Sequence, residues 1–176
     1  MILKGNNIVL RAVEPEDIEL LFEWENNTDN WKISNTLSPF SRDTMQMYIE
    51  IAQKDIFENK QLRLMIDSKD SLKTIGAIDL FDFDPFNQRA GIGVLINDVS
   101  DRRKSYASDA LNTLIDYAFN VLSLKQLYCN IGVNNKSSIL LFEKFGFEKI
   151  GVKKQWHRTA HNTWEDELFY QLISSI

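Results

Sequence analysis

Residues 94–108 read VLINDVSDRRKSYAS, and this stretch decides the predicted fold. It begins as the apolar end of a strand, continues as a polar turn with three consecutive cations at Arg102–Lys104, and passes into a helix that starts with small residues. A helix N-terminus offers unpaired N–H groups and a partial positive charge, which suit a pyrophosphate. A solvated basic turn before an ordinary capped helix fits the same residues. The stretch alone leaves both interpretations open.

A second stretch, NNKSSILLFEKFGF at residues 134–147, follows a strand predicted over Gln126–Val133. Its apolar spacing predicts a short helix over about Ser137–Phe145, and Gly146 suits the left-handed position that ends such a helix. A longer helix is predicted over about Ser105–Asn120, between the basic turn and that strand. On its own, the second stretch is explained as a capped amphipathic helix.

The remaining segments predict a meander of strands, two further helices and a closing hairpin. One helix begins at Pro15 and is stopped by Asn26-Asn27; a second is capped by Ser41, with Met45, Ile49, Ala52 and Ile56 on one face. The strands are expected at Ile8–Val13, Arg63–Asp67, Thr74–Phe83 and Arg89–Ile96, and the hairpin at Gly151–Arg158 and Trp164–Leu172 around Ala160–Asn162. An antiparallel meander feeding a β-α-β crossover predicts an α/β (α+β) fold, with a mixed, mainly antiparallel central sheet flanked by helices on both faces. Residues 1–176 are expected to form one domain.

Composition narrows the class of protein. With 176 residues and 44% hydrophobic content, the chain suits a single core. The single cysteine, Cys129, excludes an intrachain disulfide framework, and only two histidines, His157 and His161, argue against a metal site. The apolar runs fall short of the roughly 20 residues that span a bilayer, and MILKGNNIVLRAV lacks the features of a signal peptide. A net charge of −5 argues against nucleic acid. We therefore expect a cytoplasmic protein with no membrane or nucleic-acid partner.

Together and in this order, the two stretches resemble the GNAT family of acetyltransferases, nearest its branch of bacterial spermidine N-acetyltransferases and ribosomal-protein Nα-acetyltransferases. The family's pyrophosphate motif, Arg/Gln-x-x-Gly-x-Gly/Ala, falls on Arg102–Ala107, and its Asn-x-x-Ser/Ala…Lys-x-Gly-Phe motif falls on Asn134–Phe147. The resemblance extends from Leu10-Arg11 to the C-terminal hairpin, and it implies a GNAT-like fold with acetyl-CoA as co-substrate. The residues that it implies for acetyl-CoA binding are Leu95, Ile96, Arg102, Arg103, Lys104, Ser105, Tyr106, Ala107, Ser108, Asn134, Ser137 and Phe142.

The sequence departs from the family pattern at two positions. Ser105 stands where the family has glycine, which allows close backbone approach because it lacks a Cβ. Serine is still small and keeps its N–H, so we expect binding to survive. Phe142 stands where many members have a tyrosine proposed to protonate the departing thiolate, and a phenyl ring cannot donate a proton.

Acetyl transfer to an amine requires a neutral amine, a polarised thioester carbonyl and a protonated leaving thiolate. The resemblance implies that a backbone N–H near Leu95 or Ile96 stabilises the carbonyl oxygen, while proximity supplies much of the rate. A carboxylate, directly or through water, has to accept the proton of an alkylammonium. Asp79 is the candidate, with Asp82 beside it on the same strand. The pleat predicts that at most one points inward, and both fit equally well as edge or surface acids.

For the leaving thiolate, Ser137 is the candidate proton donor in place of Phe142. The alternatives are that Ser137 only helps to cap its helix and that an ordered water suffices, because a thiolate is a fair leaving group. Tyr106 and Cys129 are weaker candidates.

The acceptor side carries an acidic stretch, with seven acids and no lysine or arginine between Glu14 and Asp29. A negative rim that includes Glu23 and Glu25, together with Asp79 and Asp82, would attract a polycation such as spermidine. A solvated helix face explains the same charges. We therefore expect an N-acetyltransferase for a primary amine of a polyamine. The alternatives are an Nα-acetyltransferase of a protein N-terminus and a weakly catalytic CoA-binding regulatory module. The free edge of a mixed sheet would allow a homo-oligomer.

Overall fold

The computed structural model describes residues 2–34, 36–102, 104–159 and 162–175, and an eight-stranded sheet of order β1-β2-β3-β4-β5-β6-β8-β7 runs through it. The strands are β1 (Ile2–Lys4), β2 (Ile8–Ala12), β3 (Leu62–Ser68), β4 (Thr74–Asp84), β5 (Arg89–Ile96), β6 (Gln126–Gly132), β7 (Glu148–Arg158) and β8 (Trp164–Ile173). The α-helices are α1 (Ile18–Glu25), α2 (Thr28–Ser34), α3 (Arg42–Ala52), α4 (Ile56–Asn59), α5 (Tyr106–Asn120) and α6 (Lys136–Lys144). Two short 3-10 helices are η1 (Pro15–Asp17) and η2 (Val99–Asp101).

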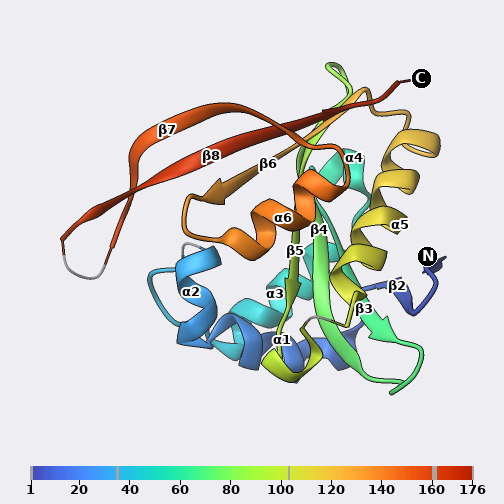
Figure 1. Ribbon diagram of the computed structural model, residues 1–176. Helices are drawn as coiled ribbons and strands as arrows, with labels where there is room; N and C mark the ends of the chain where they lie inside the picture. The colour runs from blue at the N-terminus through green and yellow to red at the C-terminus, as the bar shows by residue number, and fades with distance from the viewer. Residues whose placement is uncertain (1, 35, 103, 160–161, 176) are drawn as a thin grey trace.

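The sheet is covered by helices on both faces (Figure 1). Its neighbouring strands are antiparallel except β5 and β6, which confirms the mixed, mainly antiparallel sheet. On one face Ile78 of β4 belongs to a core that includes Leu111 of α5 and Phe142 of α6. On the other face Ala77 joins a second core with Leu21 of α1 and with α3. No helix in the described ranges is long and apolar enough to cross a membrane.

Most of the predicted elements are present, with some differences. Ser41 caps α3 by accepting the N–H of Thr44 at 3.1 Å, and Gly146 ends α6 with φ +82°. The second helix is shorter than predicted, because it ends at Ala52 and Ile56 begins the separate α4. The sequence did not predict β1 or α2, and it assigned η2 to a loop. Residues 160–161 of the expected hairpin turn lie outside the described residues.

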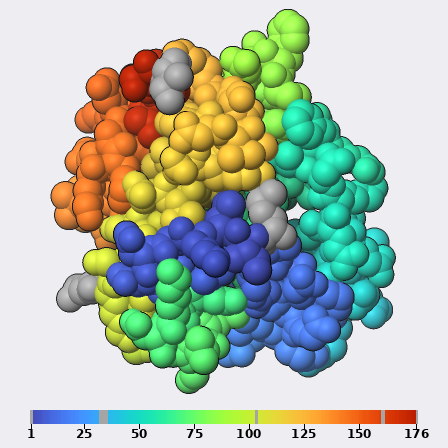
Figure 2. All heavy atoms as spheres, turned by 90° about the vertical axis from the view of Figure 1, so that its right-hand side faces the viewer, coloured from blue at the N-terminus to red at the C-terminus, as the bar shows by residue number. Residues whose placement is uncertain are grey.

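The N-terminal hairpin is held against α5 by a buried carboxylate. Asp109 accepts the backbone N–H groups of Asn6, Asn7 and Ile8 at 2.9, 2.6 and 3.2 Å. On the other side, Lys69 donates to the carbonyl oxygen of Gly5 at 2.6 Å. Figure 2 shows the resulting arrangement, in which the blue N-terminal segment lies between the yellow helix α5 and the green turn after β3. Three N–H groups satisfied by one carboxylate fix the first edge of the sheet.

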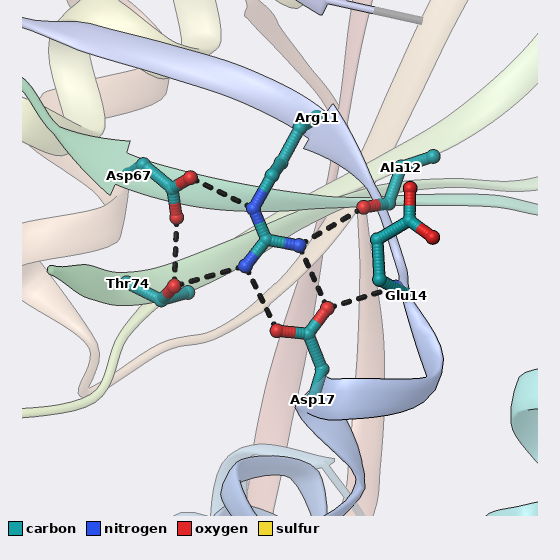
Figure 3. Close-up of polar contacts among 6 residues, drawn as sticks. All are labelled: Arg11, Ala12, Glu14, Asp17, Asp67 and Thr74. Carbon is teal, nitrogen blue, oxygen red and sulfur yellow. Dashed lines mark hydrogen bonds and ion pairs between the residues drawn. The ribbon is translucent and has the colours of Figure 1, made fainter.

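Arg11 of β2 connects this edge to the start of α1 (Figure 3). Its guanidinium donates to both oxygens of Asp17 at 2.7 and 2.8 Å, to Asp67 of β3 at 2.7 Å and to Thr74 of β4 at 3.1 Å. Asp17 also accepts the N–H of Glu14, which closes η1. Burial acts to raise the pKa of Asp17, but the hydrogen bonds from Arg11 and from the Glu14 N–H outweigh it and lower that pKa. The network therefore depends on a charged Asp17.

We predict that Arg11→Met lowers the free energy of unfolding by about 3 kcal/mol at neutral pH, because it leaves a buried carboxylate without its partner. A carboxyl whose pKa is lowered by folding stabilises the protein above its unfolded-state pKa, and that contribution is lost as the pH falls through the folded-state value. The difference between the variant and the wild type should therefore narrow below about pH 4. Urea unfolding at several pH values measures this difference in the free energy of unfolding.

The matched control is Arg42→Met, which removes an ion pair to Glu19 between two exposed side chains. Exposed pairs contribute little to stability, so this variant should unfold close to the wild type. Equal effects of the two substitutions would contradict the role given to Arg11.

Candidate active site

A gap opens in the sheet between β5 and β6. These strands pair in parallel at only three positions, Arg89 with Gln126, Ala90 with Leu127, and Gly91 with Tyr128. Beyond Gly91 the two strands separate, β5 running towards α1 and β6 turning towards the start of α6 (Figure 1). No further pair joins them within the described ranges. One side of the second half of β5 is therefore free of the backbone partners that a sheet normally supplies.

The hydrogen-bond pattern decides which N–H groups face this gap. The N–H of Asn97, just after β5, donates to the carbonyl oxygen of Ile75 at 3.0 Å. Because bonded and non-bonded pairs alternate along an antiparallel ladder, the N–H of Leu95 is directed at β4. The N–H groups of Ile96 and Val94 are directed into the gap. Of the two predicted donors, Ile96 is suitably oriented and Leu95 is not, while Val94 was missed.

The basic turn lies at the end of this gap. Arg102 donates to the carbonyl oxygens of Ile96 and Asn97 at 3.2 and 3.1 Å, and its side chain remains exposed. Lys104 contacts Asp101 at 2.8 Å, and this hydrogen bond raises the pKa of Lys104. Arg103 lies outside the described residues. Two of the three predicted cations, Arg102 and Lys104, therefore lie at the turn, and each forms hydrogen bonds to a neighbouring residue.

Ser105 caps the start of α5 in the left-handed conformation, with φ +64° and ψ +5°. This explains the glycine of the family pattern, because L-residues other than glycine are strained there. The first hydrogen bond within α5 runs from the N–H of Asp109 to the carbonyl oxygen of Ser105. The N–H groups of Tyr106, Ala107 and Ser108 precede this bond and have no acceptor within the helix. The ring of Tyr106 is buried and its hydroxyl accepts from Ser68. Tyr106 therefore contributes backbone rather than side chain to this surface.

The start of α6 carries the predicted serine. Asn135 is the cap and accepts the N–H of Ser138 at 3.2 Å, while the exposed Ser137 donates its hydroxyl to the Asn135 side chain at 3.0 Å. The exposed Asn134 directs its N–H to Glu165 at 3.2 Å. Ser137 therefore supports the cap, and its oxygen stays at the surface.

Phe142 and Cys129 are core residues. Phe142 is 4% exposed and packs edge-to-face on Phe147, with ring centroids 5.0 Å apart. Its ring fills the core beneath α6, where it has little surface to offer to a cofactor. Burial raises the pKa of the Cys129 thiol to about 12, so this thiol is neither an acid nor a nucleophile near neutral pH.

Asp79 is held by an arginine that the sequence analysis did not single out. Both of its oxygens accept from Arg63 of β3, at 2.7 and 2.9 Å, and Arg63 also donates to Glu25 at 2.7 Å. Burial acts to lower the pKa of Arg63, but the charge and hydrogen bonds of Asp79 outweigh it and raise that pKa. Two carboxylates share one cation, so the group keeps a net negative charge. Both oxygens of Asp79 are thus engaged by Arg63, and its role as proton acceptor stays a prediction. Glu23 is exposed and outside this group.

Asp82 lines a separate cavity on the same face of the sheet. A bulge follows Phe81, Asp82 takes φ +49°, and its carboxylate accepts the hydroxyl of Tyr128 at 3.0 Å. Burial, with this bond to Asp82, raises the pKa of Tyr128 to about 12. Asp82 is exposed and Asp79 is partly buried, so the expectation that at most one of the two acids points inward stays compatible with the structure. The cavity has a volume of about 630 Å³ and is lined by Asp82, Asp84, Arg89, Gln126, Tyr128, Phe169 and Gln171.

A second charged group, on β7 and β8, was also missed. Glu167 is 6% exposed and contacts His157 at 2.6 Å and Lys153 at 2.8 Å. Lys153 also donates to Asn130 of β6 at 2.7 Å. The available signal was the presence of charged residues inside a predicted hairpin, but only the register brings them together.

Comparisons with known proteins agree with the fold. The sequence profile of the Acetyltransferase (GNAT) domain matches residues 7–148. The spermidine N(1)-acetyltransferase of Vibrio cholerae is 24% identical over 150 residues, which cover 84% of this chain and 82% of that protein. A crystal structure of spermidine N-acetyltransferase from Vibrio cholerae with CoA and spermine has a TM-score of 0.84 at 22% identity, with 96% of each chain covered. Ribosomal-protein-S5-alanine acetyltransferase from Vibrio fischeri has a TM-score of 0.86 at 17% identity, with 99% of this chain and 97% of that chain covered. The two structures show the same fold.

We predict that Ser105→Gly stabilises the protein by about 1 kcal/mol, because it removes the strain of a left-handed serine. Ser108→Gly, three residues later inside α5, should destabilise it by about 0.5 kcal/mol, since glycine is a poor helix residue. The two substitutions are chemically identical, and urea unfolding compares them directly. Effects of the same sign would contradict the strain at Ser105.

Proposed function

Because the chain belongs to the GNAT family of acetyltransferases, which use acetyl-CoA as the acetyl donor, we propose that its acceptor is a primary amine of a polyamine such as spermidine. The observation that carries the proposal is the pair of carboxylate sites on one face of the sheet. One is the net-negative group of Glu25, Arg63 and Asp79, and the other is the cavity at Asp82. The similarity to a spermidine N(1)-acetyltransferase supports the same acceptor.

The gap between β5 and β6 supports the position of the donor. Acetyl-CoA supplies the activated thioester. The N–H groups of Val94 and Ile96 are oriented to stabilise the negative charge that develops on its carbonyl oxygen. The N-terminus of α5, with Arg102 and Lys104 beside it, suits the pyrophosphate. Ser137 keeps an exposed hydroxyl at the start of α6 and is the side chain we assign to protonating the leaving thiolate.

The acceptor side matches a molecule with several positive charges. Of the seven acids between Glu14 and Asp29, Asp17, Glu19 and Glu25 pair with arginines. The other four are exposed and extend the negative surface around α1 and α2. In the cavity, the rings of Tyr128 and Phe169 lie 5.6 Å apart beside Asp82, and aromatic faces attract alkylammonium groups. One ammonium group would occupy this cavity while another reaches the gap.

The proposal includes a cytoplasmic location and an assembly of several copies. Cys129 is the single cysteine and is free, as in proteins of reducing compartments. The edge strand β7 exposes Ile150, Val152 and Trp156, a surface that a second copy would cover.

We predict that Arg102→Glu and Lys104→Glu each weaken CoA binding by about tenfold or more at low salt, which corresponds to about 1.4 kcal/mol. Calorimetry with CoA measures the dissociation constant directly. Lys54→Glu is the matched control, because Lys54 also forms an exposed local pair, to Glu58, but lies far along the chain from the turn. Unchanged affinity in both turn variants would place CoA elsewhere.

We predict that spermidine has a higher kcat/KM than a monoamine of similar length, because charge attraction acts on encounter and binding. Raising the ionic strength from about 0.01 to about 0.15 M shortens the Debye length from about 30 to about 8 Å and should reduce the preference. Asp82→Asn and Glu25→Gln should also reduce it, while Glu50→Gln on the exposed side of α3 should not. Thiol release from acetyl-CoA gives these rates.

Three outcomes separate the candidate functions. Equal rates and equal salt responses for spermidine and the monoamine would contradict a polyamine acceptor. Faster acetylation of a peptide N-terminus would identify an Nα-acetyltransferase. Binding of CoA without thiol release on any amine would identify a regulatory CoA-binding module.

A further inference from the structure

Gly93 lies in the interior of β5, and nothing in the described part of the chain requires a glycine there. A glycine weakens a strand, and it often marks a bulge, a bend or a place that a ligand or another backbone approaches closely. Gly93 pairs with Asp79 in a regular stretch of the ladder, and its φ angle is not positive. A Cβ added to Gly93 would meet one atom of the described residues within 4 Å, in the Phe81 ring at 3.8 Å, which is an ordinary contact. Neither the backbone nor a described neighbour therefore explains this glycine.

The nearby Gly91 differs from Gly93 in this respect. Gly91 is buried, and an added Cβ would approach the Phe81 ring to 2.2 Å, so packing accounts for that glycine. Gly93 is only half-buried. Because alternate residues of a strand share a face, the two glycines lie on the face of β5 that the Phe81 ring covers. The open space over Gly93 therefore begins at the edge of that ring.

This space lies between the gap and the negative group on β3 and β4. On one side is Val94, the next residue of β5, whose N–H is directed into the gap, and adjacent residues are about 3.3 Å apart along a strand. On the other side is Asp79, the cross-strand partner of Gly93, and Cβ positions directly opposite each other are about 5 Å apart. Asp79 and Glu25 share the single cation Arg63, so the group is negative. An ammonium group over Gly93 would lie close to a carboxylate and to the proposed thioester site.

We propose that Gly93 is a specificity-determining residue of the acceptor site, because its missing side chain leaves the space in which the amine end of the acceptor lies. The inference rests on the proposed function, since it requires an amine acceptor. The Phe81 ring borders this space and offers an apolar surface to the methylene groups next to the nitrogen. Asp79, across the ladder, offers the negative charge. A side chain at position 93 would fill the space and exclude the amine without disturbing the fold.

The test is the affinity of the full-length protein, saturated with CoA, for spermidine and for a monoamine of similar length. CoA carries no acetyl group to transfer, so calorimetry measures amine binding without turnover. Gly93→Ala should raise both amine dissociation constants by about tenfold, because the added methyl group overlaps the acceptor. Gly93→Val should raise them further, since its side chain is larger and strands accept it well. With acetyl-CoA, kcat/KM for both amines should fall in the same order.

Gly151→Ala and Gly151→Val are the matched controls. Gly151 is also a half-buried glycine in a strand, and a Cβ added there meets no atom of the described residues within 4 Å. These two variants should keep the wild-type amine affinity. The CoA affinity of Gly93→Ala should match that of the wild type, and its unfolding midpoint should equal or exceed the wild-type value, because alanine is favoured over glycine inside a strand.

The outcomes separate this site from the proposed function. Unchanged amine affinity in both Gly93 variants would overturn the site, and so would a loss that is matched by an equal loss of CoA affinity or by a lower unfolding midpoint. The monoamine has the same amine end as spermidine, so it tests Gly93 even if the wild type binds the two amines equally and the polyamine proposal fails. Failure of the wild type to bind either amine would contradict the proposed function, and the site with it.

Discussion

The separation of β5 from β6 after Gly91 is the constraint on which the site depends. Had parallel pairing continued, the N–H groups of Val94 and Ile96 would be bonded to β6, and the sheet would offer no opening. The packing around the junction holds the strands together up to that point. The ring of Phe81 lies so close to Gly91 that an added Cβ would approach it to 2.2 Å, so a glycine is required there. The opening is therefore built into the sheet.

The structure contains two charged groups, Arg63 with Glu25 and Asp79, and Lys153 with Glu167 and His157, that differ in the number of carboxylates per cation. Arg63 forms ion pairs with both Glu25 and Asp79, so this group keeps a negative charge that is suited to holding an ammonium group. In the group on β7 and β8, Lys153 and His157 both contact the single carboxylate of Glu167. Buried charges without partners are costly. The number of carboxylates per cation thus sets the charge that each group presents.

The sequence predicted the parts of the structure that depend on local pattern. The meander strands, the cap at Ser41 and the helix end at Gly146 follow from periodicity and short-range chemistry. The sequence marked Ser105 as a departure from the family's glycine, and the reason given for that glycine was close approach of the backbone to the pyrophosphate. The structure adds a second reason, because the backbone of Ser105 is left-handed. Arg63 with Asp79, and His157 with Glu167, were missed because both pairs depend on cross-strand register and bulges. Register and bulges are set by the packing of the whole sheet.

The bonds from Asp109 to the N-terminal backbone have a consequence for synthesis on the ribosome. They join groups 101 to 103 residues apart. The first two strands therefore emerge long before the carboxylate that satisfies their N–H groups has been translated. Until α5 follows, the N–H groups of Asn6, Asn7 and Ile8 lack this carboxylate and hydrogen-bond to water instead. Closing so long a loop is a slow event that comes late in translation. Nascent chains that end before Asp109 therefore leave these three N–H groups without their acceptor in the protein.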